Sequence, residues 1–181
     1  MEQNENKILL HACCAICSGY PITLLKEMGY SVIVYFCNPN LDTNEEFERR
    51  LEAQKTVCEY FQVELLVEEY YPSEYLDYVS GLENEPEKGK RCDKCIELRL
   101  FKTAQKAKEL GINTFTTSLT ISPHKNFDKI HALGENIAKD FKLIYPSLNF
   151  KKKDGFLKTN KISKDLNLYR QNYCGCKFAK R

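Results

Sequence analysis

Short apolar segments alternate with helical stretches along this chain of 181 residues, and this alternation restricts the fold more than any other feature. We expect strands over five segments, residues 8–11, 31–36, 63–67, 113–119 and 142–145. Helices are expected over six, residues 18–28, 44–61, 75–82, 93–110, 127–140 and a short one that begins at Ser163 and ends near the last cysteines. Strands that alternate with helices form a parallel sheet covered on both faces. The sequence therefore predicts a single α/β domain over residues 1–181, built on one open, mainly parallel sheet.

The chain contains nine cysteines, and seven of them fall into three tight groups. These are Cys13, Cys14 and Cys17, then Cys92 and Cys95, then Cys174 and Cys176. An odd number cannot be used up in disulfides, whereas closely spaced thiolates suit one metal centre because a short loop presents several ligands together. Cys37 and Cys58 stand apart from the groups, and we expect them to be packed in the core.

The first cysteine group directly follows the first predicted strand, and residues 118–124 follow the fourth. Ligands of open parallel sheets bind beyond the carboxyl ends of the strands, so both loops should face one crevice. A nucleotide-binding protein of this architecture carries a glycine-rich phosphate loop after strand one. This chain has His-Ala-Cys-Cys-Ala-Ile-Cys at that place, which disfavours ATP chemistry and predicts a metal site.

Sulfur ligands alone do not decide which metal binds, because zinc and iron–sulfur clusters both take four cysteines. Seven grouped cysteines exceed four, and the surplus favours a cluster beside a second metal or a reactive thiol. A thioredoxin-like dithiol is a third interpretation, but it requires one Cys-x-x-Cys pair and not three groups.

Basic residues are concentrated at the end of the chain. Residues 150–181 hold ten Lys or Arg and two Asp, for a charge of +8, which leaves −6 for residues 1–149. Aromatic residues lie between these cations, a pattern that suits a phosphate backbone with exposed bases, although a solvated basic terminus is the simpler alternative. Arg99 and Lys94 are also able to meet phosphate, but a solvated helix face is the default expectation for both.

The first seven residues are polar and acidic, and no apolar run reaches the ~18–20 residues of a membrane span. We therefore expect neither a signal peptide nor a membrane partner. A cytoplasmic location, where thiols stay reduced, agrees with cysteines that serve a metal and not disulfides.

The motifs together resemble the QueH-type epoxyqueuosine reductases, the cobalamin-independent family. The matching segments occur in family order over nearly the whole chain: residues 9–17, 35–40, 91–100, 116–125, 150–155 and 168–176. Two positions depart from the family pattern. Ile16 replaces the usual proline, and Cys37 stands where an aromatic residue is common. Neither departure removes a grouped cysteine.

This resemblance implies an adenine nucleotide α-hydrolase-like (HUP-type) fold, and a [4Fe-4S] cluster with a mononuclear iron beside it. It implies a tRNA substrate that carries epoxyqueuosine at the wobble position. The reaction is a two-electron deoxygenation of the epoxide to an alkene with release of water. An external donor of the ferredoxin or flavodoxin type would supply the electrons.

Residue roles follow as expectations from the resemblance. Cys92 and Cys95 would bind the cluster, together with one cysteine of the pair Cys13 and Cys14 and one of the pair Cys174 and Cys176. The other member of each pair, with Cys17, would hold the second iron. This iron would act as a Lewis acid toward the epoxide oxygen. His11 and Cys17 are the catalytic candidates. The alternative for His11 is a structural histidine whose ring nitrogens are hydrogen-bonded within the core. The expected tRNA contacts are Lys151, Lys152, Lys153, Arg170 and Tyr173.

Two other functions stay open at this point. One is a zinc-stapled tRNA-binding module without redox chemistry, which the content of zinc, iron and acid-labile sulfide distinguishes from a reductase. The other is a cluster-dependent tRNA thiolation enzyme, which would require the ATP loop that is missing after strand one.

Overall fold

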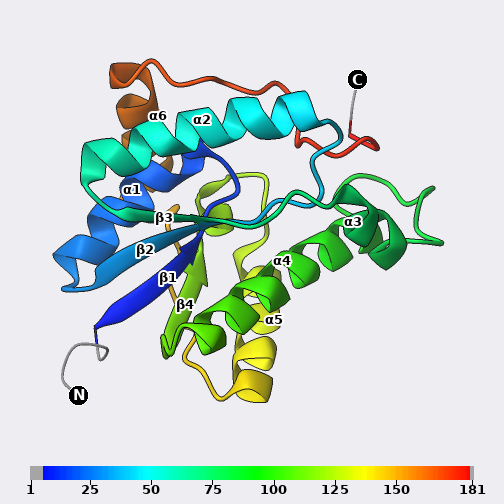
Figure 1. Cartoon of the computed structure of the whole chain (residues 1–181), viewed down its shortest axis with the longest axis horizontal. Coiled ribbons are helices and arrows are strands. Elements are labelled where there is room, and N and C mark those ends of the chain that lie inside the picture. Colours follow the sequence, from blue (N-terminus) through cyan, green and yellow to red (C-terminus); the bar gives the residue numbers. More distant parts are fainter. Residues whose placement is uncertain (1–5, 180–181) are drawn as a thin grey trace.

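The computed structural model describes residues 6–179, and its centre is a four-stranded parallel sheet in the order β3-β2-β1-β4 (Figure 1). The strands are β1 (Lys7–His11), β2 (Ser31–Phe36), β3 (Glu64–Val67) and β4 (Thr114–Thr117). The register pairs Leu9 of β1 with Ile33 on one side and with Phe115 on the other. The predicted open parallel sheet is confirmed.

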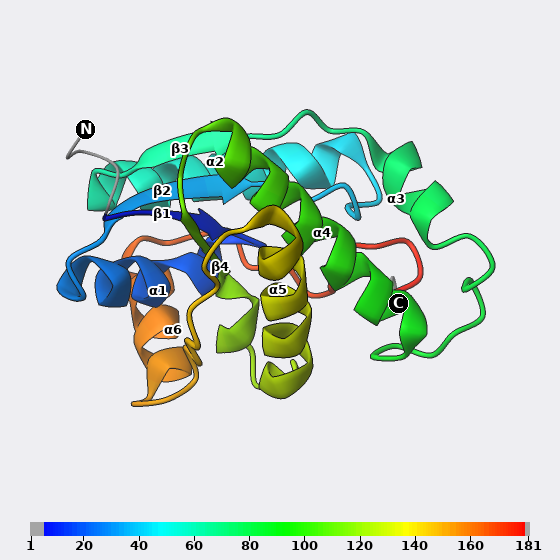
Figure 2. The same cartoon turned by 90° about the horizontal axis from the view of Figure 1, so that it is seen from below.

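Helices cover both faces of this sheet (Figures 1 and 2). One face carries α1 (Ala15–Glu27) and α2 (Asn44–Phe61), with α6 (Gly155–Asp165) packed on α1. The other face carries α4 (Lys90–Glu109) and α5 (Phe127–Phe141), and the short α3 (Pro72–Tyr78) lies against α4. A 3-10 turn, η1 (Ser118–Ile121), directly follows β4.

Alternation of side chains along β1 explains why the sheet has two buried faces. Ile8 and Leu10 are fully buried in the core beneath α1 and α2, whereas Leu9 is fully buried in the core shared with α4 and α5. Successive side chains of a strand point to opposite faces, so an uninterrupted apolar run requires cover on both. Cys37 and Cys58 are buried in these two cores, as expected.

Two predicted elements are wrong. Residues 142–145 do not form a fifth strand but a single bridge between Thr114 and Ile144, and Pro146, which has no amide hydrogen, follows directly. The last helix is α6, and it ends near Ser163 instead of beginning there. Asn167 takes a left-handed conformation (φ 50°) and the Leu168 amide donates to the Ser163 carbonyl, a pattern that terminates helices.

Within residues 6–179, none of the helices combines the length and the apolar character that crossing a membrane requires.

Candidate metal centre

A cavity of about 560 Å³ opens at the carboxyl end of the sheet and brings the three cysteine groups together. Cys13 and Cys14 lie in the turn between β1 and α1, and Cys17 lies in the first turn of α1. Further thiols come from the first turn of α4 and from the C-terminal segment. The six cysteines that line the cavity are Cys13, Cys14, Cys17, Cys92, Cys174 and Cys176.

The first group forms the tightest set of possible ligands. The sulfur atoms of Cys13, Cys14 and Cys17 all lie within 4.8 Å of one another, and those of Cys13 and Cys14 are 3.9 Å apart. Thiolates bound to one tetrahedral ion at ~2.3 Å lie about 3.8 Å from each other. This donor set therefore fits a single thiophilic ion such as iron or zinc. In the described part of the chain, no other group of three His, Cys, Asp or Glu ligand atoms is this compact.

Hydrogen bonds among the three thiols give them different pKa values. Those from Cys14 and Cys17 lower the pKa of Cys13 well below its usual value. The hydrogen bond with Cys13 raises the pKa of Cys14 to about 12. Hydrogen bonds with Cys13 and Cys14 raise the pKa of Cys17. The group thus stabilises one thiolate, and a thiolate is the form of cysteine that binds metal.

Residues at the ends of β1 and β4 hold Cys13 in place. The Cys13 amide donates to Ser118 Oγ at 3.2 Å, and the Cys13 sulfur lies 3.5 Å from the same oxygen. His11 is fully buried, with Nδ1 2.9 Å from Thr117 Oγ1 and Nε2 2.9 Å from the Cys37 carbonyl. Burial, followed by the charge of Arg99, lowers the pKa of His11 to about 4, so its ring is neutral at physiological pH.

The remaining four grouped cysteines are not gathered as compactly as the first three. Cys95 is buried and does not line the cavity, but it packs in one apolar cluster with Cys176. Cys92 is half-buried near the start of α4, where its sulfur accepts a hydrogen bond from the Lys88 amide at 3.3 Å. Cys174 is exposed.

Sequence reasoning missed Arg99 as part of the site. The expected solvated face is wrong for this residue: Arg99 is 3% exposed, lines the cavity and donates from Nε to the Cys95 carbonyl at 3.3 Å. Burial acts to lower its pKa, but nearby thiols, first Cys95 and then Cys174, outweigh burial and raise it. Its spacing from Cys95 and Ile96 on one helix face was the available signal, since residues three and four apart share a face.

The expected tRNA contacts lie in different environments. Lys152 and Lys153 are exposed, whereas the half-buried Lys151 donates from Nζ to the Lys125 carbonyl. Arg170 is exposed, but its guanidinium bonds Asn160 and Ser163 of α6. Tyr173 lines the cavity. Lys180 and Arg181, which belong to the predicted basic segment, lie outside the described residues.

A solved structure shares this fold. The predicted subunit of a tRNA methyltransferase from Methanocaldococcus jannaschii superposes with a TM-score of 0.59 over 86% of this chain and 74% of its own, at 10% sequence identity. The fold and the site thus define a class of α/β protein: it has an adenine nucleotide α-hydrolase-like fold, and cysteines occupy the place of the phosphate loop.

Within that class, the chain belongs to the epoxyqueuosine reductase QueH family, whose sequence model matches residues 8–181. Its relatives with this name include proteins from Streptococcus pyogenes serotype M1 (40% identical, covering 98% of this chain and 72% of the relative) and Staphylococcus epidermidis (36%, 96% and 76%). The protein of that name from Thermotoga maritima is 33% identical, with 95% of this chain and 89% of the relative covered. The predicted family and the assignment to an oxidoreductase are confirmed.

Proposed function

We propose that this chain reduces epoxyqueuosine to queuosine at the wobble position of tRNA, using iron held by its grouped cysteines. The observation that carries the proposal is the cavity at the end of the sheet, where six thiols from three distant segments meet in a member of this reductase family. A chain that served only to bind RNA would not need so many free thiols in one cavity.

The seven cysteines divide into a compact set of three and a looser set of four. The spacing of Cys13, Cys14 and Cys17 favours a mononuclear iron, which leaves Cys92, Cys95, Cys174 and Cys176 for a [4Fe-4S] cluster. When bound, the cluster would supply the two electrons singly and the iron would act as a Lewis acid. This division departs from the one expected from the sequence, which splits the first group between the two centres.

The residues at the cavity mouth suit an anionic substrate. Lys88 and Lys125 line the cavity, and Lys152 and Lys153 are exposed on the loop that precedes α6. Phosphate contacts by such cations position a nucleic acid without reading its sequence. In this arrangement the wobble nucleotide enters the cavity, where Tyr173 is a further contact, while the flanking phosphates stay outside it within reach of cations such as Arg170.

Removing the epoxide oxygen as water takes up two electrons and two protons. His124 and Lys125 line the cavity and can carry protons in from solvent. His11 has both ring nitrogens in hydrogen bonds and a pKa of about 4, so we assign it the positioning of the Cys13 loop. Cys17 lines the cavity and would serve there as a ligand of the iron.

A zinc-stapled tRNA-binding module is the second candidate, because the spacing of the three compact thiols suits zinc equally well. Metal analysis of anaerobically purified protein distinguishes the two: iron with acid-labile sulfide supports the reductase, and zinc without sulfide supports the module. The cytoplasmic location and a ferredoxin- or flavodoxin-type electron donor stay predictions.

The decisive experiment is anaerobic reconstitution with iron and sulfide, then incubation with epoxyqueuosine-containing tRNA and a chemical reductant. Mass analysis of the digested nucleosides should show conversion to queuosine. A Cys13→Ser variant should lose conversion, whereas Cys58→Ala, which alters a core thiol outside the cavity, should retain it. Absence of conversion by the wild-type protein with a full iron load would contradict the proposal.

A further inference from the structure

The segment that carries the last two cysteines lies along the outside of the molecule. From the end of α6, it passes α2 and reaches the carboxyl end of the sheet, beside the first turn of α2 (Figure 1). We call residues 169–176 the strap. Its residues form no helix or strand, so its position depends on contacts with the rest of the chain.

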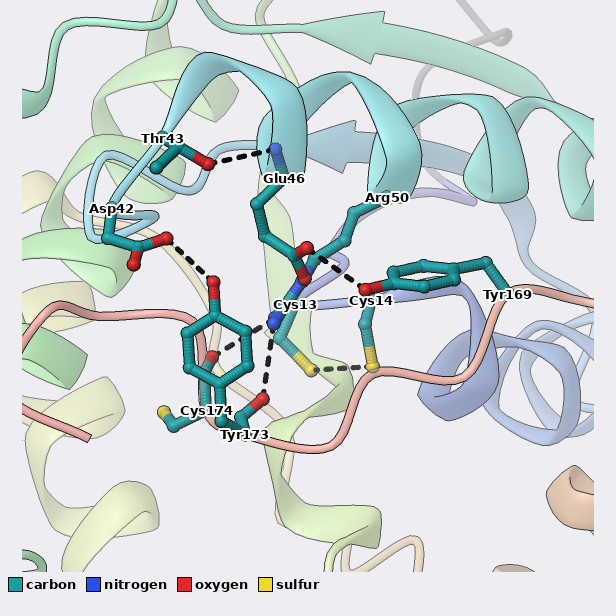
Figure 3. A network of polar contacts seen from close by, with 9 residues as sticks. All are labelled: Cys13, Cys14, Asp42, Thr43, Glu46, Arg50, Tyr169, Tyr173 and Cys174. Carbon is teal, nitrogen blue, oxygen red and sulfur yellow. Dashed lines mark hydrogen bonds and ion pairs between the residues drawn. The ribbon is translucent and has the colours of Figure 1, made fainter. Parts of the chain in front are cut away.

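A buried ion pair on α2 makes the central contact with the strap (Figure 3). Arg50 is 3% exposed and donates from Nε to Glu46 Oε1 at 2.7 Å. Its two terminal nitrogens donate to the carbonyls of Cys174 and Tyr173 at 3.0 and 3.1 Å. One guanidinium therefore binds a carboxylate and two successive strap carbonyls, which its fork of donors permits and a lysine ammonium does not.

Three further contacts join the strap to the same end of α2. The Tyr173 hydroxyl donates to Asp42 Oδ1 at 2.6 Å, and the Tyr169 hydroxyl donates to Glu46 Oε2 at 3.0 Å. The Asp42 amide donates to the Gly175 carbonyl at 2.8 Å. Gly175 has φ +112°, and a Cβ there would collide with Leu41 and press on Arg50, so this close approach requires glycine.

We propose that Arg50 and Glu46 form a clamp that positions Cys174 and Cys176 at the metal centre, with Arg50 as the positioning residue. The clamp binds the two backbone carbonyls that flank the α-carbon of Cys174, those of Tyr173 and Cys174. It therefore fixes the backbone that carries the thiols and leaves the thiols themselves free for metal. The role in metal binding rests on the proposed function, whereas the clamp itself is a property of the metal-free chain.

The test compares thiol reactivity in the reduced, metal-free protein. Cys176 is 6% exposed and should react slowly with iodoacetamide as long as the strap is docked. Arg50→Lys keeps a cation beside Glu46 but loses the fork, so labelling of Cys176 should accelerate about tenfold as the strap opens. Cys58, a buried residue further along α2 itself, reports general unfolding, and its labelling rate should not change.

Lys55→Arg is the matched control, because Lys55 is exposed on the same helix and pairs with Glu52, away from the strap. Its labelling pattern should equal that of the wild type. Tyr173→Phe removes only the hydrogen bond to Asp42 and should accelerate Cys176 labelling by a smaller factor, about threefold. This second variant keeps the proposal testable if Arg50→Lys does not fold.

A second readout follows the metal. After reconstitution, iron release to a chelator should be about tenfold faster from Arg50→Lys than from Lys55→Arg. Unchanged Cys176 labelling in both Arg50→Lys and Tyr173→Phe, or equal acceleration of Cys176 and Cys58, would overturn the clamp. If wild-type protein takes up no iron, the proposed function fails, and the labelling result still decides whether the clamp exists.

Discussion

The backbone amide of Cys13 donates a hydrogen bond to the hydroxyl of Ser118, 105 residues further along the chain. This bond joins the turn after β1 to the turn after β4, the two loops that the parallel sheet brings to its carboxyl edge. The position of the first cysteine group therefore depends on the pairing of β1 with β4 as much as on its own short loop.

Ser118→Ala should destabilise the metal-free protein by about 1–2 kcal/mol, because the Cys13 amide loses its partner and Ser118 is buried. Urea unfolding followed by circular dichroism measures this change. Ser122→Ala is the control: Ser122 accepts a bond from the His124 amide, and His124 is exposed, so the effect should stay within about 0.5 kcal/mol. Equal effects of the two substitutions would refute the role of Ser118.

The proposed division of cysteines predicts different spectra for two variants. Cys95→Ser should abolish the visible absorption of the cluster, because Cys95 belongs to the set of four. Cys14→Ser should retain that absorption and lose one equivalent of iron. Iron and sulfide analysis of both reconstituted proteins measures the outcome. Loss of the cluster spectrum in Cys14→Ser would instead support the division expected from the sequence.

His11 should make stability depend on pH. Its pKa is about 4 in the folded chain against 6.5 when unfolded, so between these values only the unfolded state binds the proton. The contribution of neutral His11 to the free energy of unfolding is therefore fully present above pH 6.5. It is lost as the pH falls toward 4, by up to about 3 kcal/mol. Denaturant unfolding of metal-free His11→Gln should show a smaller loss over this range than the wild type. An identical pH dependence in the two proteins would disprove this linkage.

Arg99 should raise the reduction potential of the bound cluster. It is a buried cation within the cavity wall, and net charge near a cluster is one of the factors that set its potential. Arg99→Gln should therefore lower the midpoint potential, whereas Arg99→Lys keeps the charge and should change it less. Redox titration followed by electron paramagnetic resonance measures both. Equal potentials in Arg99→Gln and wild type, with intact clusters, would rule out this electrostatic effect.

Lys152 and Lys153 should contribute to tRNA binding through phosphate contacts. Replacing both with Ala should reduce the slope of the logarithm of the binding constant against the logarithm of the salt concentration by about two. The loss of affinity is therefore largest at low salt. Filter binding across a range of salt concentrations measures the slope. Lys55→Ala, on the exposed face of α2 and paired with Glu52, should leave it unchanged. A wild-type slope in the double variant would exclude both lysines from the interface.

Much of the fold was predictable because its signals are local. The apolar runs of β1 and β2, the threonine-rich β4 and the helix that begins at the second cysteine pair all appear where the sequence predicts them. The end of the chain was not predictable in this way. Residues 166–179 contain no helix, because two backbone carbonyls of the strap accept hydrogen bonds from Arg50, more than 120 residues earlier in the chain, instead of from a helix.

The sequence by itself determined the α/β class, the metal-type grouping of the cysteines and the family, since each depends on residue types and spacings along the chain. Only the tertiary structure decided which sulfurs lie close enough to share one ion, and that Arg99 is buried in the wall of the same cavity. It also decided that Arg50 and Glu46 bind the strap. Such contacts join segments far apart in sequence, and they exist only after the parallel sheet has brought its loops to one edge.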